Sequence, residues 1–255
     1  MKFATIGHLL DEKTINLMPK DWIREKYIIS PKINLDKTSG HIIALKLTAK
    51  QIMQEPRDFI RKEILDAVIF AQDSLDINLI QLGALTTSVT EGGKWLAENN
   101  EYQGFLNHGD SYTAAAVCQI TLKAIEKLNK NPSDQKIAIV GAYGIIGEAV
   151  SKILVPKFAH SLLIGRRKEK LKELGKKIEG NFETTTNLDK NNADIIITAT
   201  NHPTALLESR HLKKNAIIID VSQPPNLSPD ICLKRSDIIR VDGGFVNFNH
   251  EFRQI

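Results

Sequence analysis

The stretch that decides the fold reads Ile137-Ala138-Ile139-Val140-Gly141-Ala142-Tyr143-Gly144-Ile145-Ile146-Gly147. An apolar run leads into glycines at every third position, and an apolar helical pattern follows over Glu148–Val155. Glycine permits a tight turn and a close approach of backbone N–H groups to a ligand, and the N-terminus of a helix attracts anions. The stretch therefore predicts a diphosphate-binding loop of a dinucleotide site over Gly141–Gly147, with one more residue before the second glycine than the usual fingerprint has.

Short apolar runs and amphipathic stretches alternate on the C-terminal side of residue 132. Strands rich in Ile, Val and Leu are typical of a parallel sheet buried on both faces. This alternation predicts a doubly wound parallel sheet of the Rossmann type. The predicted strands are Ile137–Val140, Ser161–Ile164, Phe182–Thr186, Asp194–Thr198, Ala216–Asp220 and Asp237–Val241, and the helices include Glu148–Val155 and Arg167–Ile178.

The N-terminal part is also mixed α/β. The polar, proline-bearing stretch Asn129–Asp134 predicts a boundary near residue 132, between an N-terminal α/β substrate domain (1–132) and a Rossmann domain (133–255). A helix over residues 110–130, with Asp110 or Ser111 as its N-cap, is expected to connect them. The other predicted elements are strands at Phe3–Ile6, His41–Lys46 and Asn78–Leu82 and one helix at Gln51–Gln72.

The end of the second Rossmann strand indicates which dinucleotide is bound. A site for NAD usually has Asp or Glu there, to bind the ribose 2′-hydroxyl. This chain has Arg166 and Arg167 instead, and guanidinium groups suit a 2′-phosphate. The predicted cofactor is therefore NADP(H). By analogy with the fold, Thr198, Ala199 and Thr200 after the fourth strand, and Gly243 and Gly244 after the last, are expected on the nicotinamide side.

Composition excludes several classes of protein. The chain has 255 residues, a formal net charge of +4 and only 6% aromatic residues, so nucleic-acid binding is not indicated. No apolar run is long enough for an integral membrane segment, and the N-terminus lacks a secretory pattern, which favours a cytoplasmic protein. The two cysteines exclude a disulfide scaffold, and the histidines show no metal-binding spacing, so no metal is expected.

Five segments in order resemble the long-chain acyl-[acyl-carrier-protein] reductases of cyanobacteria, over almost the whole chain. They are Ile6–Leu9, Asp76–Ser88, Gly109–Ala114, the Val140–Gly147 loop and Asp242–Gly244. The resemblance implies NADPH-dependent reduction of a fatty acyl thioester to an aldehyde, with a cysteine thiolate that takes the acyl group. In that family the cysteine lies beyond the part matched here, so the acyl-transfer step is expected to be altered or missing. From charge alone, an acidic carrier protein is expected to dock on the basic run Arg166–Lys177.

Other residues leave the catalytic chemistry open. Lys94 and Asp110 resemble the acid/base pair of shikimate-dehydrogenase-type enzymes, which predicts a hydroxy-acid dehydrogenase as the alternative. His8, at the end of the first strand, is either a cleft residue or a structural histidine. Cys118 falls within the long predicted helix, where a buried thiol needs no chemistry, so it is a remote candidate for the nucleophile. The sequence also leaves open two further alternatives: a non-catalytic protein that binds NADP(H), and a homo-oligomer.

Overall fold

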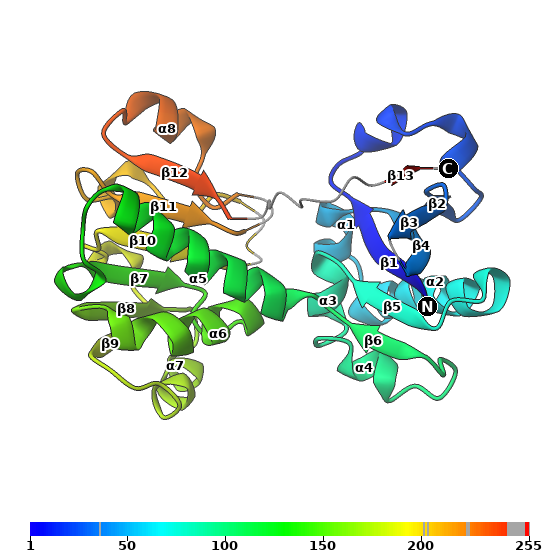
Figure 1. Ribbon diagram of the computed structural model, residues 1–255, viewed down its shortest axis with the longest axis horizontal. Coiled ribbons are helices and arrows are strands. Elements are labelled where there is room, and N and C mark those ends of the chain that lie inside the picture. The colour runs from blue at the N-terminus through cyan, green and yellow to red at the C-terminus, as the bar shows by residue number, and fades with distance from the viewer. Residues whose placement is uncertain (36, 201, 203, 223–224, 244–252, 255) are drawn as a thin grey trace. The chain divides into compact units, whose positions relative to one another are not determined.

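The computed structural model describes residues 1–35, 37–200, 202, 204–222, 225–243 and 253–254. Its contacts divide the chain into a first unit, Met1–Gly109 with Phe248–Ile255, and a second unit, Asp110–Asn247. Among the described helices, none combines the length and hydropathy needed to cross a membrane. Figure 1 shows each unit built around its own sheet.

The first unit contains a mixed sheet in the order β13-β3-β4-β1-β5-β6, with β2 also paired to β4. Strands β1, β4, β5 and β6 run parallel, whereas β2, β3 and β13 pair antiparallel. Alternate residues of β1 and β4, such as Ile6 and Ile43, are fully buried in a core that also receives Ile60 and Ile64 of α2. The strands are β1 (Lys2–Leu9), β2 (Tyr27–Ile29), β3 (Ile33–Leu35), β4 (Thr38–Thr48), β5 (Leu79–Leu82), β6 (Phe105–Asn107) and β13 (Arg253–Gln254).

The helices of the first unit differ from the prediction in one place. The single helix predicted over Gln51–Gln72 is two helices, α1 (Ala49–Gln54) and α2 (Arg57–Leu75). Pro56 separates them: Glu55 is extended at φ −72° and ψ 158°, because the proline ring disfavours a helical conformation in the preceding residue. Two short helices, α3 (Leu85–Val89) and α4 (Lys94–Ala97), follow β5, and two 3₁₀ turns, Thr14–Leu17 and Lys20–Trp22, follow β1.

The second unit is a doubly wound parallel sheet in the order β12-β11-β10-β7-β8-β9, as the sequence predicts (Figure 1). Counted from β7, the order is 3-2-1-4-5-6, which places the reversal of the winding between β7 and β10. The strands are β7 (Lys136–Val140), β8 (His160–Ile164), β9 (Phe182–Thr185), β10 (Ile195–Thr198), β11 (Ile217–Asp220) and β12 (Ile239–Asp242), and the helices are α5 (Asp110–Lys127), α6 (Ile145–Leu154), α7 (Lys168–Gly175) and α8 (Pro229–Lys234).

Alternation along the strands builds two cores on the two faces of this sheet. Ile137 and Ile139 enter the core that contains residues of α5, α6 and α7, while Ala138 and Val140 enter the other. Helix α5 contributes Ala114, Val117, Cys118 and Ile125 to the first of these cores. The helix predicted as a connector thus packs as part of the second unit, and the division falls at Gly109/Asp110 rather than near residue 132.

Candidate dinucleotide-binding site

The glycine loop lies between β7 and α6, at the carboxyl edge of the second sheet. Gly141 has φ +85°, and a Cβ there would collide with the carbonyl oxygen of Ala199, so both conformation and space require glycine. A Cβ on Gly147 would collide with the carbonyl oxygen of Gly141, which shows how closely α6 approaches the loop. The loop is tied down by hydrogen bonds from the N–H groups of Gly141 and Ala142 to the Ile164 carbonyl, at 2.9 and 3.1 Å.

The start of α6 fits a diphosphate. Gly144 is its N-cap, and the N–H groups of Ile145, Ile146 and Gly147 in the first turn have no acceptor within the helix. A Cβ on Gly144 would lie 3.2 Å from the Gly141 oxygen, a tighter contact than Cβ atoms usually make. The acid in this turn, Glu148, is neutralised by Lys152 at 2.7 Å and Lys177 at 3.2 Å. The free N–H groups and the positive end of the helix dipole therefore suit the binding of an anion at this helix N-terminus.

The residues after β8 form the second part of the site. Gly165 lies against the ring of Tyr143, where a Cβ would overlap the ring atoms. The guanidinium carbon of Arg167 stands 5.5 Å from the centre of that ring, a cation–π arrangement. Burial alone would raise the pKa of Tyr143, but the Arg167 guanidinium holds this pKa below its usual value. Arg166 is exposed, and its guanidinium forms no ion pair with the residues that the structure describes.

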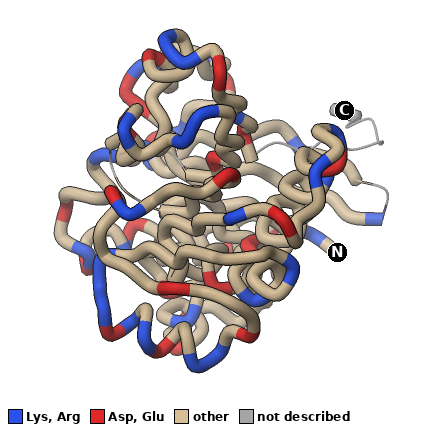
Figure 2. Tube along the Cα trace, turned by 90° about the vertical axis from the view of Figure 1, so that its left-hand side faces the viewer, with Lys and Arg blue, Asp and Glu red and all other residues tan. Residues whose placement is uncertain are grey.

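Charged groups around α7 are mixed rather than gathered on one face. Lys170 pairs with Glu173 at 3.0 Å, and Lys177 pairs with Glu148. Figure 2 shows basic and acidic residues interspersed along the trace on this side of the chain. The predicted basic run is thus partly neutralised, and Arg166 remains as an unpaired cation among the described residues at the edge of the dinucleotide loop.

A buried carboxylate that sequence reasoning missed organises the far side of this edge. Asp220 ends β11 and is 1% exposed. Its carboxylate accepts from the Thr198 hydroxyl at 2.6 Å, from the N–H groups of Ser222, Asn226 and Leu227 at 3.0 to 3.3 Å, and from Arg240 at 3.4 Å. The network fixes the ends of the segment after β11. An acid that closes an otherwise apolar strand was the signal in the sequence.

The residues predicted on the nicotinamide side take different roles. The Ala199 carbonyl packs over Gly141, as described above, so this residue does adjoin the loop. Thr198 is fully buried and turned to Asp220, while Thr200 donates to Asn226 Oδ1 at 2.6 Å. Asn226 is also fully buried, and its Nδ2 has no partner in the described chain. Gly243 donates its N–H to the Asp220 carbonyl at 2.9 Å, and Gly244 lies outside the described residues.

The two predicted acid/base residues belong to different units. Lys94 begins α4 in the first unit, has a 71% exposed side chain and pairs with Glu98 at 3.6 Å. Asp110 is the first residue of α5, in the second unit. Whether the two act together stays a prediction. Among the described residues, no group of three or more His, Cys, Asp or Glu is arranged to hold a metal ion.

His8 and Cys118 are both built into packed structure. His8 donates from Nδ1 to the Leu9 carbonyl at 2.7 Å, and its Nε2 accepts the Leu85 N–H at 3.4 Å. Burial lowers its pKa, so the neutral ring with the proton on Nδ1 fits both contacts. Cys118 is 5% exposed in the core beside α5, and burial raises the pKa of its thiol to about 11. Such a thiol is a poor nucleophile at neutral pH.

Comparisons with known proteins show which proteins this chain resembles. Residues 123–243 match the family model of shikimate / quinate 5-dehydrogenase. Glutamyl-tRNA reductase of Thermosipho melanesiensis is 32% identical over 121 residues, which cover 46% of this chain and 32% of that protein. Aminotransferase PigE of Serratia sp. (strain ATCC 39006) is 23% identical over 239 residues, which cover 88% of this chain and 27% of that protein. The chain thus spans about a quarter to a third of the length of these curated relatives.

Among solved structures, L-tryptophan dehydrogenase from Nostoc punctiforme is similar over 95% of this chain and 70% of its own, with 15% identity and a TM-score of 0.50. This likeness shows a shared α/β fold. These matches do not show the long-chain acyl-[acyl-carrier-protein] reductase family, so that membership stays a prediction. Together with the glycine loop and the strand order, they support NAD(P) binding by the second unit, which is similar to the shikimate / quinate 5-dehydrogenase family and distantly similar to glutamyl-tRNA reductase.

Proposed function

We propose that this protein is an oxidoreductase that uses NADP(H). The observation that carries the proposal is the end of β8, where Arg166 is exposed without a described ion-pair partner and Gly165, Arg166 and Arg167 stand in place of an acid. A carboxylate at this position would repel a 2′-phosphate, whereas a guanidinium binds it with two parallel hydrogen bonds.

Three groups of the second unit would hold the dinucleotide. The first turn of α6 would bind the diphosphate, Arg166 the 2′-phosphate, and Arg167, anchored over Tyr143, would add a second positive charge next to it. The bound dinucleotide supplies or accepts a hydride. The Asp220 network then keeps the strand ends that face the nicotinamide half in place.

Binding measurements with NADPH and NADH test the cofactor preference. We expect Arg166→Ala to weaken NADPH binding by roughly 10- to 100-fold, since hydrogen bonds to charged groups contribute about 1.5–3 kcal/mol. NADH binding should change little. Lys172→Ala is the matched control, because it removes an exposed positive charge from α7. Equal affinity of the native protein for both dinucleotides, or equal weakening of both by Arg166→Ala, would contradict the proposal.

For the substrate we propose an activated acyl group, reduced to an aldehyde. The resemblance to acyl-[acyl-carrier-protein] reductases and the similarity to a relative named as a reductase of glutamyl-tRNA support this class. With a thioester, NADPH and a proton enter, and the aldehyde, the free thiol and NADP⁺ leave. Because the Cys118 thiol is buried with a raised pKa, the hydride is proposed to reach the incoming thioester directly, and the substrate's own thiol is the leaving group.

A hydroxy-acid dehydrogenase is the second candidate, favoured by the shikimate / quinate 5-dehydrogenase match. That match covers residues 123–243 and so includes neither Lys94 nor Asp110. Purified protein should be given long-chain acyl-carrier-protein with NADPH and, in parallel, shikimate-like hydroxy acids with NADP⁺. Aldehyde that persists in Cys118→Ala supports direct reduction. Oxidation of a hydroxy acid that is lost in Lys94→Ala supports the second candidate, and tight NADPH binding without any turnover favours a binding protein.

A further inference from the structure

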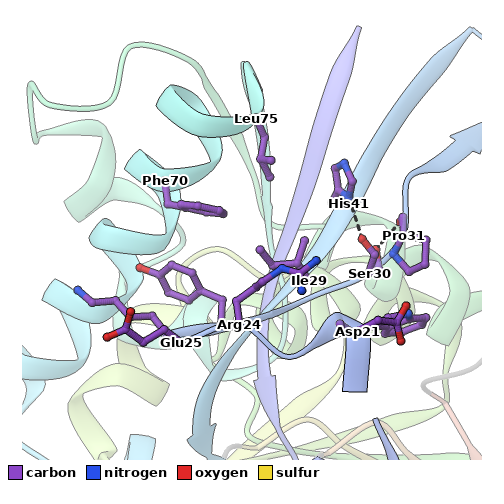
Figure 3. A pocket seen from close by; sticks show the side chains of 12 residues that line it. Asp21, Arg24, Glu25, Ile29, Ser30, Pro31, His41, Phe70 and Leu75 are labelled. Atoms are coloured by element: carbon purple, nitrogen blue, oxygen red, sulfur yellow. Dashed lines mark hydrogen bonds between the residues drawn. The ribbon is translucent and has the colours of Figure 1, made fainter. Parts of the chain in front are cut away.

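The first unit contains a cavity of about 620 Å³ that the dinucleotide site does not use. It lies among the segment Asp21–Pro31, His41 of β4, and Phe70 and Leu75 of α2. Its volume is within the range of roughly 300–1,000 Å³ that is usual for small-ligand sites. Figure 3 shows side chains from these three elements around one space.

One wall of the cavity is aromatic. Tyr27 and Phe70 pack with ring centres 5.2 Å apart and planes tilted by 41°, and Trp22 also lines the space. Tyr27 is buried, whereas Phe70 and Leu75 are half-buried and pack on the core of the first unit with their other sides. A flat apolar group can therefore contact rings here without any rearrangement of the core.

The opposite rim is rigid and polar. His41 donates from Nδ1 to the Ser30 carbonyl at 2.9 Å. The Ser30 hydroxyl donates to the Pro31 carbonyl at 2.8 Å and accepts the Ile42 N–H at 2.9 Å. Since Ser30 is buried and its hydroxyl is engaged in both directions, this rim shapes the cavity.

Arg24 supplies an available positive charge. Its backbone N–H donates to the Tyr27 carbonyl at 2.8 Å, which fixes the start of the side chain. Its guanidinium forms no ion pair within the described chain, and Figure 3 shows it reaching in beside Ile29. In the same view Glu25 lies on one side of Arg24 and Asp21 on the other. The cavity is lined by two basic side chains, Arg24 and Lys26, and by two acidic ones, Asp21 and Glu25. Lys26 lies 3.9 Å from Asp66, which leaves the Arg24 guanidinium as the lining cation without a described ion-pair partner. One such cation suits a single negative charge better than a phosphate dianion.

We propose that this cavity binds a small aromatic monocarboxylate. The carboxylate pairs with the Arg24 guanidinium, and the ring lies against Phe70 and Tyr27. The site belongs wholly to the first unit and does not depend on the proposed oxidoreductase activity.

Tryptophan fluorescence of the full chain tests the proposal, because Trp22 lines the cavity. Phenylacetate is the probe, and phenylacetamide is its neutral counterpart. We expect saturable quenching by phenylacetate that Trp22→Phe removes, and much weaker binding of phenylacetamide. Arg24→Gln should weaken phenylacetate binding about tenfold, with Arg24→Lys in between.

Lys50→Gln is the matched control, since it removes an exposed charge of the same unit away from the cavity. It should bind phenylacetate as the native protein does, and saturating NADPH should not displace the probe. Equal binding of phenylacetate and phenylacetamide, no effect of Arg24→Gln in a variant with native circular dichroism, or no saturable binding would each overturn the proposal.

Discussion

His8 is held at both ring nitrogens, and its protonation is therefore coupled to folding. Burial lowers its pKa below 6.5 in the folded protein, although the Leu9 carbonyl offsets part of this effect. The unfolded chain then binds the proton at higher pH than the folded chain. The stabilising contribution of the neutral ring is present above about pH 6.5 and is lost as the pH falls below it.

Urea unfolding of the native protein and of His8→Gln measures this coupling. The difference in unfolding free energy between the two should shrink from about pH 8 to about pH 5. An NMR titration should place the pKa of His8 below 6.5. A pKa above that value would contradict the structural role and would reopen a role in catalysis.

Asp220 has the most hydrogen-bond partners of the residues described around the site, and its replacement tests that network. Asp220→Asn removes the charge that faces Arg240 and turns one acceptor into a donor against backbone N–H groups. We expect the unfolding free energy to fall by about 3 kcal/mol or more. Glu179→Gln removes an exposed carboxylate and should change it by less than about 0.5 kcal/mol. Equal, small effects of both in urea unfolding would show that the network is not stabilising.

At the scale of single residues, the sequence predicts positions that the backbone conformation requires better than it predicts which side chains pair with one another. The turn at Gly141 and Gly147 was predictable from their spacing after an apolar strand, and neither position has room for a Cβ. The place of Arg166 was predictable because it follows a recognisable strand, while its role in binding stays a prediction. The hydrogen bond between Thr198 and Asp220 was not predictable. These residues stand 22 positions apart on two strands, and no local sequence pattern connects their side chains. The burial of Cys118 followed from its place on the apolar side of α5.

At the scale of elements, α1 depends on a reciprocal cap. The Thr48 hydroxyl accepts the Gln51 N–H at 3.2 Å, and Gln51 Oε1 accepts the Thr48 N–H at 2.8 Å. Thr48→Ala should lower the unfolding free energy by about 1 kcal/mol, whereas Thr48→Ser should keep most of the stabilisation that the cap provides. In chemical denaturation, the double variant Thr48→Ala with Gln51→Ala should lose less unfolding free energy than the two single variants lose in sum. Strict additivity would mean that the two caps act separately.

Mainly apolar strands and long helices were predictable, whereas three-residue strands were not. Strands β10 and β11 are buried along their whole length, and β7 is buried after its first residue, so hydrophobicity alone marks them. Strands β2, β3 and β6 have only three residues each and form by pairing with β4 or β5, which no local periodicity records. The break at Pro56 was present in the sequence, but the apolar face continues across it from Ile52 to Ile60.

At the scale of the whole molecule, the doubly wound sheet was predictable because a series of short, mainly apolar strands separated by helical or turn segments leaves few other arrangements. The boundary between the two units was less predictable. The polar segment around residue 132 is only the turn between α5 and β7, and the packing of α5 places the division before it. Composition cannot show this, since an amphipathic helix has the same pattern whichever unit it packs on.

Hydrogen exchange with and without NADPH tests which unit α5 stabilises. At about 100 times its Kd, a ligand adds about 2.7 kcal/mol to the stability of the unit that binds it. Amides that open only by unfolding of that unit then exchange more slowly. We expect α5 to gain protection together with β7, β10 and β11, because Val117 and Ile125 share a core with those strands. Strands β1 and β4 and helix α2, which have their own core, should gain less.

The Arg166→Ala variant at the same NADPH concentration is the control. The protection that α5 gains in this variant should fall in step with the variant's weaker affinity for NADPH. If α5 instead follows α2, the helix belongs energetically to the first unit, and the boundary lies near residue 132 after all.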